Sequence, residues 1–127
     1  MKLIATEIKL FEDLSYFDYE QNSFDLHNDF DCKKIQFEDN VIILIFKKIN
    51  TNVFIFLKFQ NTNITHFNFN FKINEALTVD NLYRGKLEVD GNLKEFNNNK
   101  GYFYLEFYNE QKIEFWSDLI LFEIENF

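Results

Sequence analysis

The chain has 127 residues and a mass of 15.5 kDa, which suits one domain over residues 1–127, and its net charge of −8 disfavours nucleic acid as a partner. Its single cysteine, Cys32, excludes an internal disulfide and favours a reducing, cytoplasmic setting. Eighteen Phe, six Tyr, three Gly and no proline indicate aromatic, strand-forming segments in which asparagine supplies the turns.

Neither a signal peptide nor a membrane-spanning segment is predicted. The N-terminal sequence MKLIATEIKLFEDL meets Glu7, Glu12 and Asp13 before any uninterrupted apolar stretch develops. The longest strongly apolar run, VIILIF at residues 41–46, is too short to cross a bilayer. We therefore expect a cytoplasmic protein that does not bind a membrane.

The first segment of the chain has a mixed pattern. Residues 2–11 alternate with Ile4, Ile8 and Leu10 on one side, which favours a strand, although Ile4, Ile8 and Phe11 also suit one face of a helix. Residues 12–22 are expected to form a loop or a short helix.

Four strands are predicted next, at residues 33–38, 41–48, 52–60 and 64–73. Because links of two or three residues join them, neighbouring strands should be antiparallel. Strands 41–48 and 52–60 are apolar on both faces, which requires cover on both sides by a helix, a second sheet or a partner. The strand at 64–73 is apolar on one face, so its phenylalanines should join the core while its asparagines face outward.

The remaining chain is predicted to begin with a long connection at residues 74–83, in which Thr78 or Asp80 would start any helical turn. Strands should follow at 84–90, with Leu87 and Val89 inward, at 101–109, and at 112–125, where the run is long enough for one bent strand or for a strand with a short end. The expected fold class is mainly β (all-β or α+β). We expect an antiparallel meander of about seven or eight strands, arranged as a sandwich or half-barrel with at most one or two short helices.

The most metal-like cluster comprises Asp25, His27, Asp29 and Asp31, which share one face if the segment DLHNDFDC is extended. It lacks the glycine and terminal glutamate of a calcium loop, and it contains neither a His-x-x-x-His nor a Cys-x-x-Cys pair. A solvated acidic stretch explains the pattern better than a metal site. No metal and no cofactor are therefore predicted.

Nucleophilic catalysis has little support in the sequence. Ser15, Ser23 and Ser117 lack the G-x-S-x-G frame, and only two histidines are available as bases. The carboxylates next to Cys32 should raise the pKa of its thiol, the reverse of what a reactive thiolate needs. The sequence therefore favours a protein that is not an enzyme.

Three quarters of the net charge lies in residues 1–31, which hold eight acids and two lysines for a net charge of −6. Aromatic residues alternate with these acids in FEDLSYFDYEQNSFDLHNDFD. The mixture suits a surface that binds a basic protein, although a solvated loop whose aromatics pack into the core has the same pattern. The residues predicted to bind the partner are Asp18, Tyr19, Glu20, Asp25, Asp29 and Asp31.

Tyr102, Tyr104 and Tyr108 form a second candidate surface, because alternation along 101–109 turns them outward, opposite the phenylalanines of the same strand. A tyrosine row also arises from cross-strand packing under a covering element. Both explanations stay open at this point.

The order FDLHNDFDCKKIQFEDNVIILIF, VFIFLKFQNTNITHFNF, a loop, YRGKLEVDG and a final aromatic strand pair resembles small β-rich immunity proteins of bacterial polymorphic-toxin systems. Those proteins commonly open with a Leu/Phe-His-Asp element, here Leu26-His27-Asn28-Asp29 with one inserted asparagine. The resemblance extends over residues 24–125. It implies a cytoplasmic protein that binds and neutralises a cognate toxin, often a basic nuclease.

Three alternatives accompany this expectation. A phage-encoded acidic inhibitor that mimics nucleic acid would bind many basic nucleases, whereas an immunity protein should discriminate sharply. A small-ligand carrier or hydrolase built as a β-barrel would have a sizeable interior cavity. A structural oligomer would bury the asparagine face of 64–73 between identical chains. The sequence does not decide between a monomer and a homodimer.

Overall fold

The computed structural model describes residues 1–9, 12–69, 77–85, 88–89, 92–93, 101–108 and 110–126, with the backbone alone at 88–89 and 92–93. Its helical element, the 3-10 helix η1, has three residues, so no helix in these ranges could span a membrane. In chain order the elements are β1 (Lys2–Ile4), η1 (Ala5–Glu7), β2 (Tyr16–Tyr19), β3 (Asn22–Asp25), β4 (Phe30–Glu38), β5 (Val41–Lys48), β6 (Val53–Gln60), β7 (Asn63–Asn68), β8 (Val79–Arg84), β9 (Glu88–Val89), β10 (Asn92–Leu93), β11 (Gly101–Phe107), β12 (Lys112–Ser117) and β13 (Leu119–Asn126).

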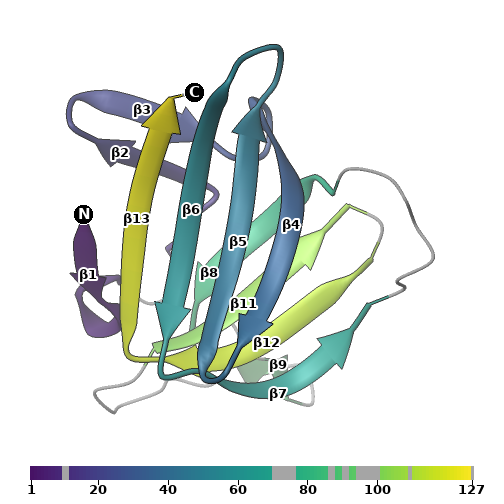
Figure 1. Ribbon diagram of the computed structural model, residues 1–127. Helices are drawn as coiled ribbons and strands as arrows, with labels where there is room; N and C mark the ends of the chain where they lie inside the picture. Colours follow the sequence, from purple (N-terminus) through teal and green to yellow (C-terminus); the bar gives the residue numbers. More distant parts are fainter. Residues whose placement is uncertain are drawn as a thin grey trace.

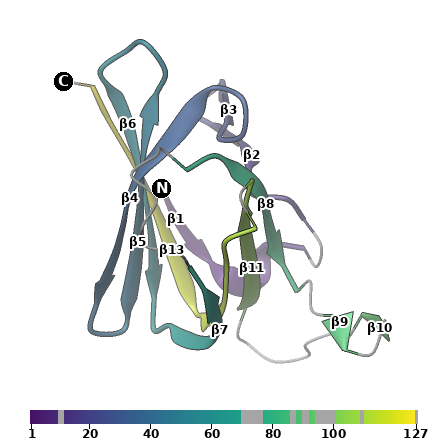
Figure 2. The same cartoon turned by 90° about the vertical axis from the view of Figure 1, so that its right-hand side faces the viewer.

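Two antiparallel sheets form two layers. The first has five strands in the order β1-β13-β6-β5-β4, and the second has four in the order β7-β12-β11-β8. Figure 1 shows the five-stranded sheet in front with the other sheet crossing obliquely behind it, and Figure 2 shows the layers edge-on. The pairs β2–β3 and β9–β10 form two smaller sheets. The prediction of a mainly antiparallel β fold is confirmed.

The two layers are joined at one corner, where two neighbouring strands bend together. The pair β6–β13 of the five-stranded sheet continues as the pair β7–β12 of the other, because β6 leads into β7 and β12 into β13. The Ser117 hydroxyl donates to the Gln60 carbonyl at 2.7 Å, and the Asp118 N–H donates to it at 3.2 Å. The predicted bent strand at 112–125 is thus confirmed as β12 and β13.

Several phenylalanine rings pack together between the sheets. The ring of Phe59 on β6 lies 5.2 Å from that of Phe103 on β11 and 4.9 Å from that of Phe115 on β12. Edge-to-face contacts of this kind add to the free energy gained by burial. The fully buried phenylalanines are Phe30, Phe46, Phe59, Phe103, Phe107 and Phe115.

Asparagine and aspartate make several of the tight turns, as predicted. Asp39, Asn50 and Asn61 have φ values of 51°, 60° and 50°. These two residue types tolerate the left-handed region because their side chains can bond the local backbone.

The expectation of a loop or short helix at 12–22 is wrong, because β2 and β3 form a hairpin there. Its turn residues Glu20 and Gln21 have φ values of 48° and 66°, a conformation that usually selects Asn-Gly, so the sequence carries no turn signal. The hairpin is held on the core by Phe17, whose ring lies 5.4 Å from that of Phe24 and 4.9 Å from that of Phe122.

Two further strand expectations need correction. Residues 79–84 form the strand β8, where a long connection with a possible helical turn was predicted. The strand forms because it pairs with β11, and Tyr83 also makes a bridge to Asp13. Residues 2–11 form a strand only at 2–4, where β1 pairs with β13, before η1 begins. The side chains of Leu87 and Val89 lie outside the described residues.

Phe67 does not join the core as expected, since 42% of its surface is exposed. It lies on β7, the edge strand of the four-stranded sheet, and its ring contacts that of Phe37 on the edge strand β4 at 5.7 Å. The strand predicted at 64–73 is shorter in the structure, because β7 ends at Asn68. Residues 70–73 lie outside the described residues.

The five-stranded sheet is covered by the four-stranded sheet on one face only. No described strand lies over the opposite face, which we call the outer sheet face (Figure 2). The prediction that β5 and β6 need cover on both sides is therefore met on one side by a second sheet. The apolar side chains of the outer sheet face are Ile4, Val41, Ile43, Ile45, Phe54, Phe56, Leu119 and Leu121.

Candidate protein-binding surface

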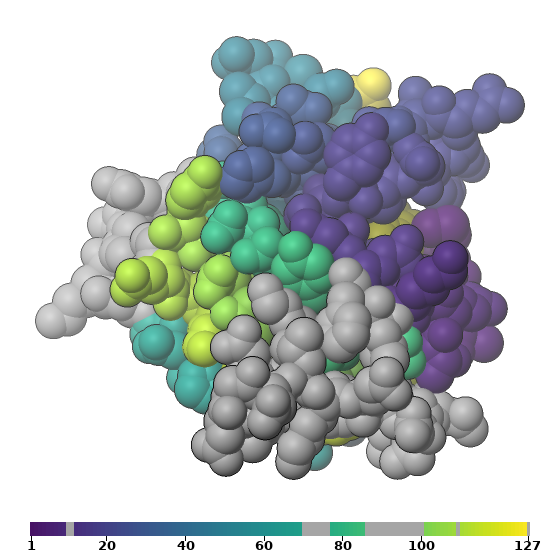
Figure 3. Space-filling model, turned by 180° about the vertical axis from the view of Figure 1, so that it is seen from behind, coloured from purple at the N-terminus to yellow at the C-terminus, as the bar shows by residue number. Residues whose placement is uncertain are grey.

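The acidic N-terminal quarter forms one continuous part of the surface, the purple region on the right-hand side of the molecule in Figure 3. Within it, the β2–β3 hairpin carries three of the predicted binding residues. Asp18 and Glu20 are exposed, and Tyr19 is half-buried. The charge of Glu20 raises the pKa of the Tyr19 phenol, so the phenol keeps its proton to a higher pH than a free tyrosine does.

Asp25 has a structural role at the start of the loop between β3 and β4. Its carboxylate accepts the backbone N–H groups of His27 and Asn28 at 3.1 and 3.0 Å, and the side-chain amide of Asn28 at 2.7 Å. Partial burial raises the pKa of Asp25, but these hydrogen bonds outweigh it and lower the pKa. Asp29 is exposed, and Asp31 lies 3.8 Å from the Lys33 ammonium.

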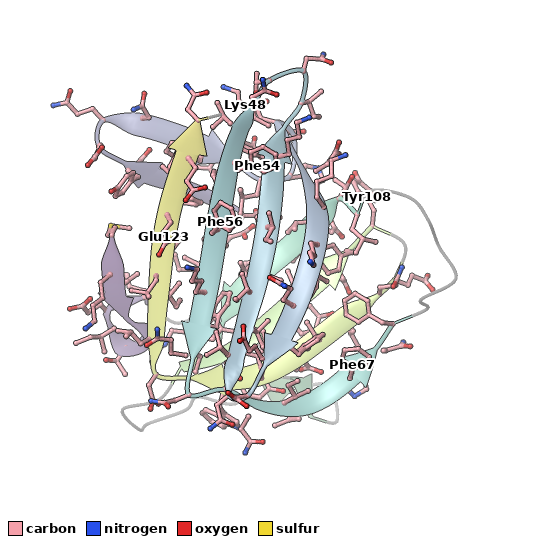
Figure 4. The ribbon with its side chains drawn as sticks, in the orientation of Figure 1. Lys48, Phe54, Phe56, Phe67, Tyr108 and Glu123 are labelled. Carbon is pink, nitrogen blue, oxygen red and sulfur yellow. The ribbon has the colours of Figure 1, made fainter. Side chains whose placement is uncertain are left out.

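The structure brings Tyr108 next to this acidic loop. The rings of His27 and Tyr108 lie 5.2 Å apart, and His27 Nδ1 lies 2.6 Å from the Val79 carbonyl oxygen. The Tyr108 side chain is 66% exposed and stands at the edge of the molecule in Figure 4. Two groups of predicted binding residues that are far apart in the sequence therefore share one surface.

The other two predicted tyrosines are engaged within the four-stranded sheet. Tyr102 was expected to be exposed, but it is 4% exposed, with its hydroxyl 2.9 Å from Thr65 Oγ1 and donating to Glu114 at 3.1 Å. Burial and Glu114 raise its pKa to about 12. Tyr104 is half-buried, and its hydroxyl donates to Glu106 at 2.6 Å. Cross-strand packing thus explains Tyr102 and Tyr104.

Residues considered as nucleophiles are buried or make hydrogen bonds within the fold. Cys32 is buried, and burial raises the pKa of its thiol to about 12, so the predicted direction is confirmed but the cause is burial rather than nearby carboxylates. Ser117 donates to the Gln60 carbonyl, and Ser15 is buried. No three His, Cys, Asp or Glu side chains among the described residues are grouped so that they could hold a metal ion.

A groove of about 390 Å³ lies beside the hairpin, and sequence reasoning missed it. We call it the N-terminal groove. Its lining combines apolar side chains with four carboxylates and one exposed tyrosine. The lining residues are Met1, Leu3, Glu7, Ile8, Glu12, Asp13, Leu14, Tyr16, Phe17, Asp18 and Phe122.

Backbone pairing with β8 fixes one wall of the groove. The Leu14 N–H donates to the Leu82 carbonyl at 2.6 Å, and Asp13 Oδ1 accepts the Ser15 N–H at 2.8 Å. The buried Arg84 side chain donates through Nη1 to the Ile8 carbonyl at 2.6 Å, and burial lowers its pKa. This wall is therefore preorganised by contacts between segments far apart in the sequence.

The groove carboxylates form no ion pair with any described residue. Their hydrogen bonds come from neutral donors: Glu7 accepts the Ile4 N–H at 3.1 Å, and Glu12 accepts the Lys9 N–H at 3.2 Å. Asp18 accepts the hydroxyl of Ser23. These carboxylates are not among any described group of three acidic, His or Cys side chains that could hold a metal ion.

Comparisons of this chain with protein-family models, with curated proteins and with solved structures give no match.

Proposed function

We propose that this protein acts by binding, without catalysis, and that it holds a basic protein with a lysine or arginine of that partner seated in the N-terminal groove. One observation carries the proposal: apolar side chains and four carboxylates line the same groove, and these carboxylates form no ion pair with a described residue. The N-terminal ammonium of Met1, which also belongs to the lining, donates to the Phe122 carbonyl at 2.8 Å. A long basic side chain matches this arrangement because its stem is apolar and its head is charged.

The aromatic residues of the groove strengthen this fit. Tyr16, which is 57% exposed, and Phe17 both line it, so a guanidinium or ammonium group can approach an aromatic face as well as a carboxylate. The stem of the bound side chain would cover Met1, which is exposed, and Phe17, which is half-buried, and both line the groove. Burial of these apolar contacts favours binding of a basic side chain over binding of an inorganic cation.

The surrounding charge supports capture of a basic partner. Residues 1–31 carry a net charge of −6, and a surface field of one sign speeds the encounter with a protein of opposite charge. The exposed acids Glu20 and Asp29 lie on the hairpin and the loop of this same quarter. We assign them to steering, whereas the groove anchors one side chain.

For the biological setting we propose an immunity protein that neutralises a cognate basic toxin, as the resemblance in the sequence implies. The acidic surface would cover the basic substrate site of the toxin. A phage-encoded inhibitor would act through the same surface but would bind many basic nucleases with similar affinity, whereas an immunity protein would bind one and reject its relatives. Binding measured against a panel of basic nucleases separates the two.

The groove is tested by titration calorimetry with a short oligoarginine peptide and with an oligoglutamine peptide of the same length. We expect the arginine peptide alone to bind. The triple variant Glu7→Gln, Glu12→Gln, Asp18→Asn should weaken binding by about tenfold or more, because it removes the charge while keeping a hydrogen-bond acceptor at each position.

The matched control is Glu38→Gln, Asp39→Asn, Glu110→Gln, which removes the same three charges from exposed positions outside the groove. The control should change the affinity for the arginine peptide by less than about twofold, an effect of the lower net charge that both triple variants share. Equal weakening by both triples would show that net charge alone attracts the peptide, and it would refute the groove as the anchor.

A further inference from the structure

We propose that the outer sheet face is the interface of a homodimer. In Figure 4, Phe54, Phe56 and Glu123 are labelled on this face, which looks toward the viewer. Ile43, Ile45 and Phe56 at its centre are half-buried although no described strand covers them. A contiguous apolar face on a sheet marks an interaction site, because leaving it in water costs free energy.

The cross-strand register orders the face into rows. Each row is read from β13 through β6 and β5 to β4. The first row is Glu123, Phe56, Ile45 and Lys34, and the neighbouring row is Leu121, Lys58, Ile43 and Gln36. The first row has an acid at one end, a base at the other and two apolar residues between them. When a second copy of this row is laid against it in the opposite direction, each acid faces a base and the apolar residues face each other.

A two-fold axis parallel to the strands, between β5 and β6, achieves this reversal. It sets Phe56 of one copy against Ile45 of the other, and Glu123 against Lys34, as an isologous interface requires. Lys34 is exposed and forms no ion pair with a described residue. Glu123 already pairs with Lys58 at 3.1 Å, so the second lysine extends an existing ion pair.

The size of the face also fits a second copy. Three of its strands have eight residues and β4 has nine. With strands about 4.8 Å apart and a rise of about 3.3 Å per residue, four strands span roughly 500 Å², so two copies bury about 1,000 Å², the lower limit of a specific interface. Two faces of the same shape and twist pack as aligned sheets do in a sandwich.

Lys58 lies inside the face, in the second row, where it pairs with Glu123, and the other charges lie at the margins. On β4, Asp31 is paired with Lys33, and Glu38 lies at the end of the strand opposite Val41. On β5, Lys47 lies 5.9 Å from the centre of the Phe54 ring. They form a polar rim around the apolar rows, as interfaces commonly have.

The test is the solution mass, measured by light scattering across a concentration series. The wild-type protein should approach twice 15.5 kDa as its concentration rises. Ile45→Asp should hold it at the monomer mass, because it places a charge in the centre of the interface. Ile64→Asp is the control, because Ile64 is an isoleucine with 41% exposure on β7, away from the outer sheet face.

Charge exchange tests the two-fold arrangement and does not depend on the folding of the Ile45 variant. Glu123→Lys and Lys34→Glu should each weaken the dimer, and the double variant should recover it toward the wild-type mass. A monomeric wild type at every concentration, or a dimer that Ile45→Asp leaves intact, would overturn the proposal. Failure of the double variant to recover would overturn the two-fold axis. None of these residues lines the N-terminal groove, so the outcome is independent of the proposed function.

Discussion

The hydroxyl of Tyr102 and the carboxylate of Glu114 are buried together and joined by a hydrogen bond of 3.1 Å. Alternation predicts the face on which Tyr102 lies, but it carries no information on what covers that face. The same limit applies to Phe67, which has the pattern of a core residue and lies on an edge strand. Asp25, by contrast, closes its own loop through local hydrogen bonds.

Tyr102→Phe should reduce the free energy of unfolding by about 1.5–3 kcal/mol, because it removes a buried hydrogen bond to a carboxylate. Tyr108→Phe is the control and should change the free energy of unfolding by less than about 0.5 kcal/mol, since the Tyr108 side chain is 66% exposed. Urea unfolding measures both. Equal effects of the two substitutions would contradict the role given to Tyr102.

The same tyrosine predicts a pH dependence. Its pKa is raised from 10.0 to about 12 in the folded protein, so the unfolded chain loses the phenolic proton first and stability falls as pH rises from 10 to 12. Because the phenylalanine introduced by Tyr102→Phe cannot titrate, the stability difference between the wild type and this variant should be constant below pH 10 and should narrow above it. A difference that does not change up to pH 12 would show that the phenol titrates normally.

At the scale of elements, strands with strong local patterns were predicted well. β5 coincides with the strand expected at 41–48, and β12 and β13 form the expected bent strand. The β2–β3 hairpin was missed because Glu20 and Gln21 adopt a turn that their residue types do not signal. β8 was missed because its stability comes from pairing with β11 rather than from its own sequence.

Gly101 shows how closely η1 packs on β11. A Cβ atom at Gly101 would lie 2.7 Å from Ala5 Cβ and 2.8 Å from Phe103 Cε2, so Gly101→Ala should destabilise the protein by about 1–3 kcal/mol. Ala5→Gly removes one of these contacts. The double variant should therefore be more stable than the sum of the single effects predicts, and strictly additive effects in urea unfolding would contradict the contact.

At the scale of the whole molecule, the fold class followed from composition and alternation, whereas the groove did not. The groove unites lining residues between Met1 and Asp18 with Phe122 of β13, and the pairing of β13 with β1 helps to bring them together. Sequence reasoning found the acidity of this quarter and one lining residue, Asp18, because charge can be counted along a chain. It missed the apolar part of the lining, because that depends on the pairing of β1 with β13 and on the contact of Phe17 with Phe122.

The central claim is that the groove seats a basic side chain, and amide NMR during titration with the oligoarginine peptide tests it most directly. We predict saturable shifts that are largest at Ile8, Leu14 and Phe17, which line the groove, and small shifts around Glu38 and Asp39. Shifts spread evenly over exposed acids throughout the chain would contradict the claim, because they would mean that the peptide responds to net charge and not to the groove.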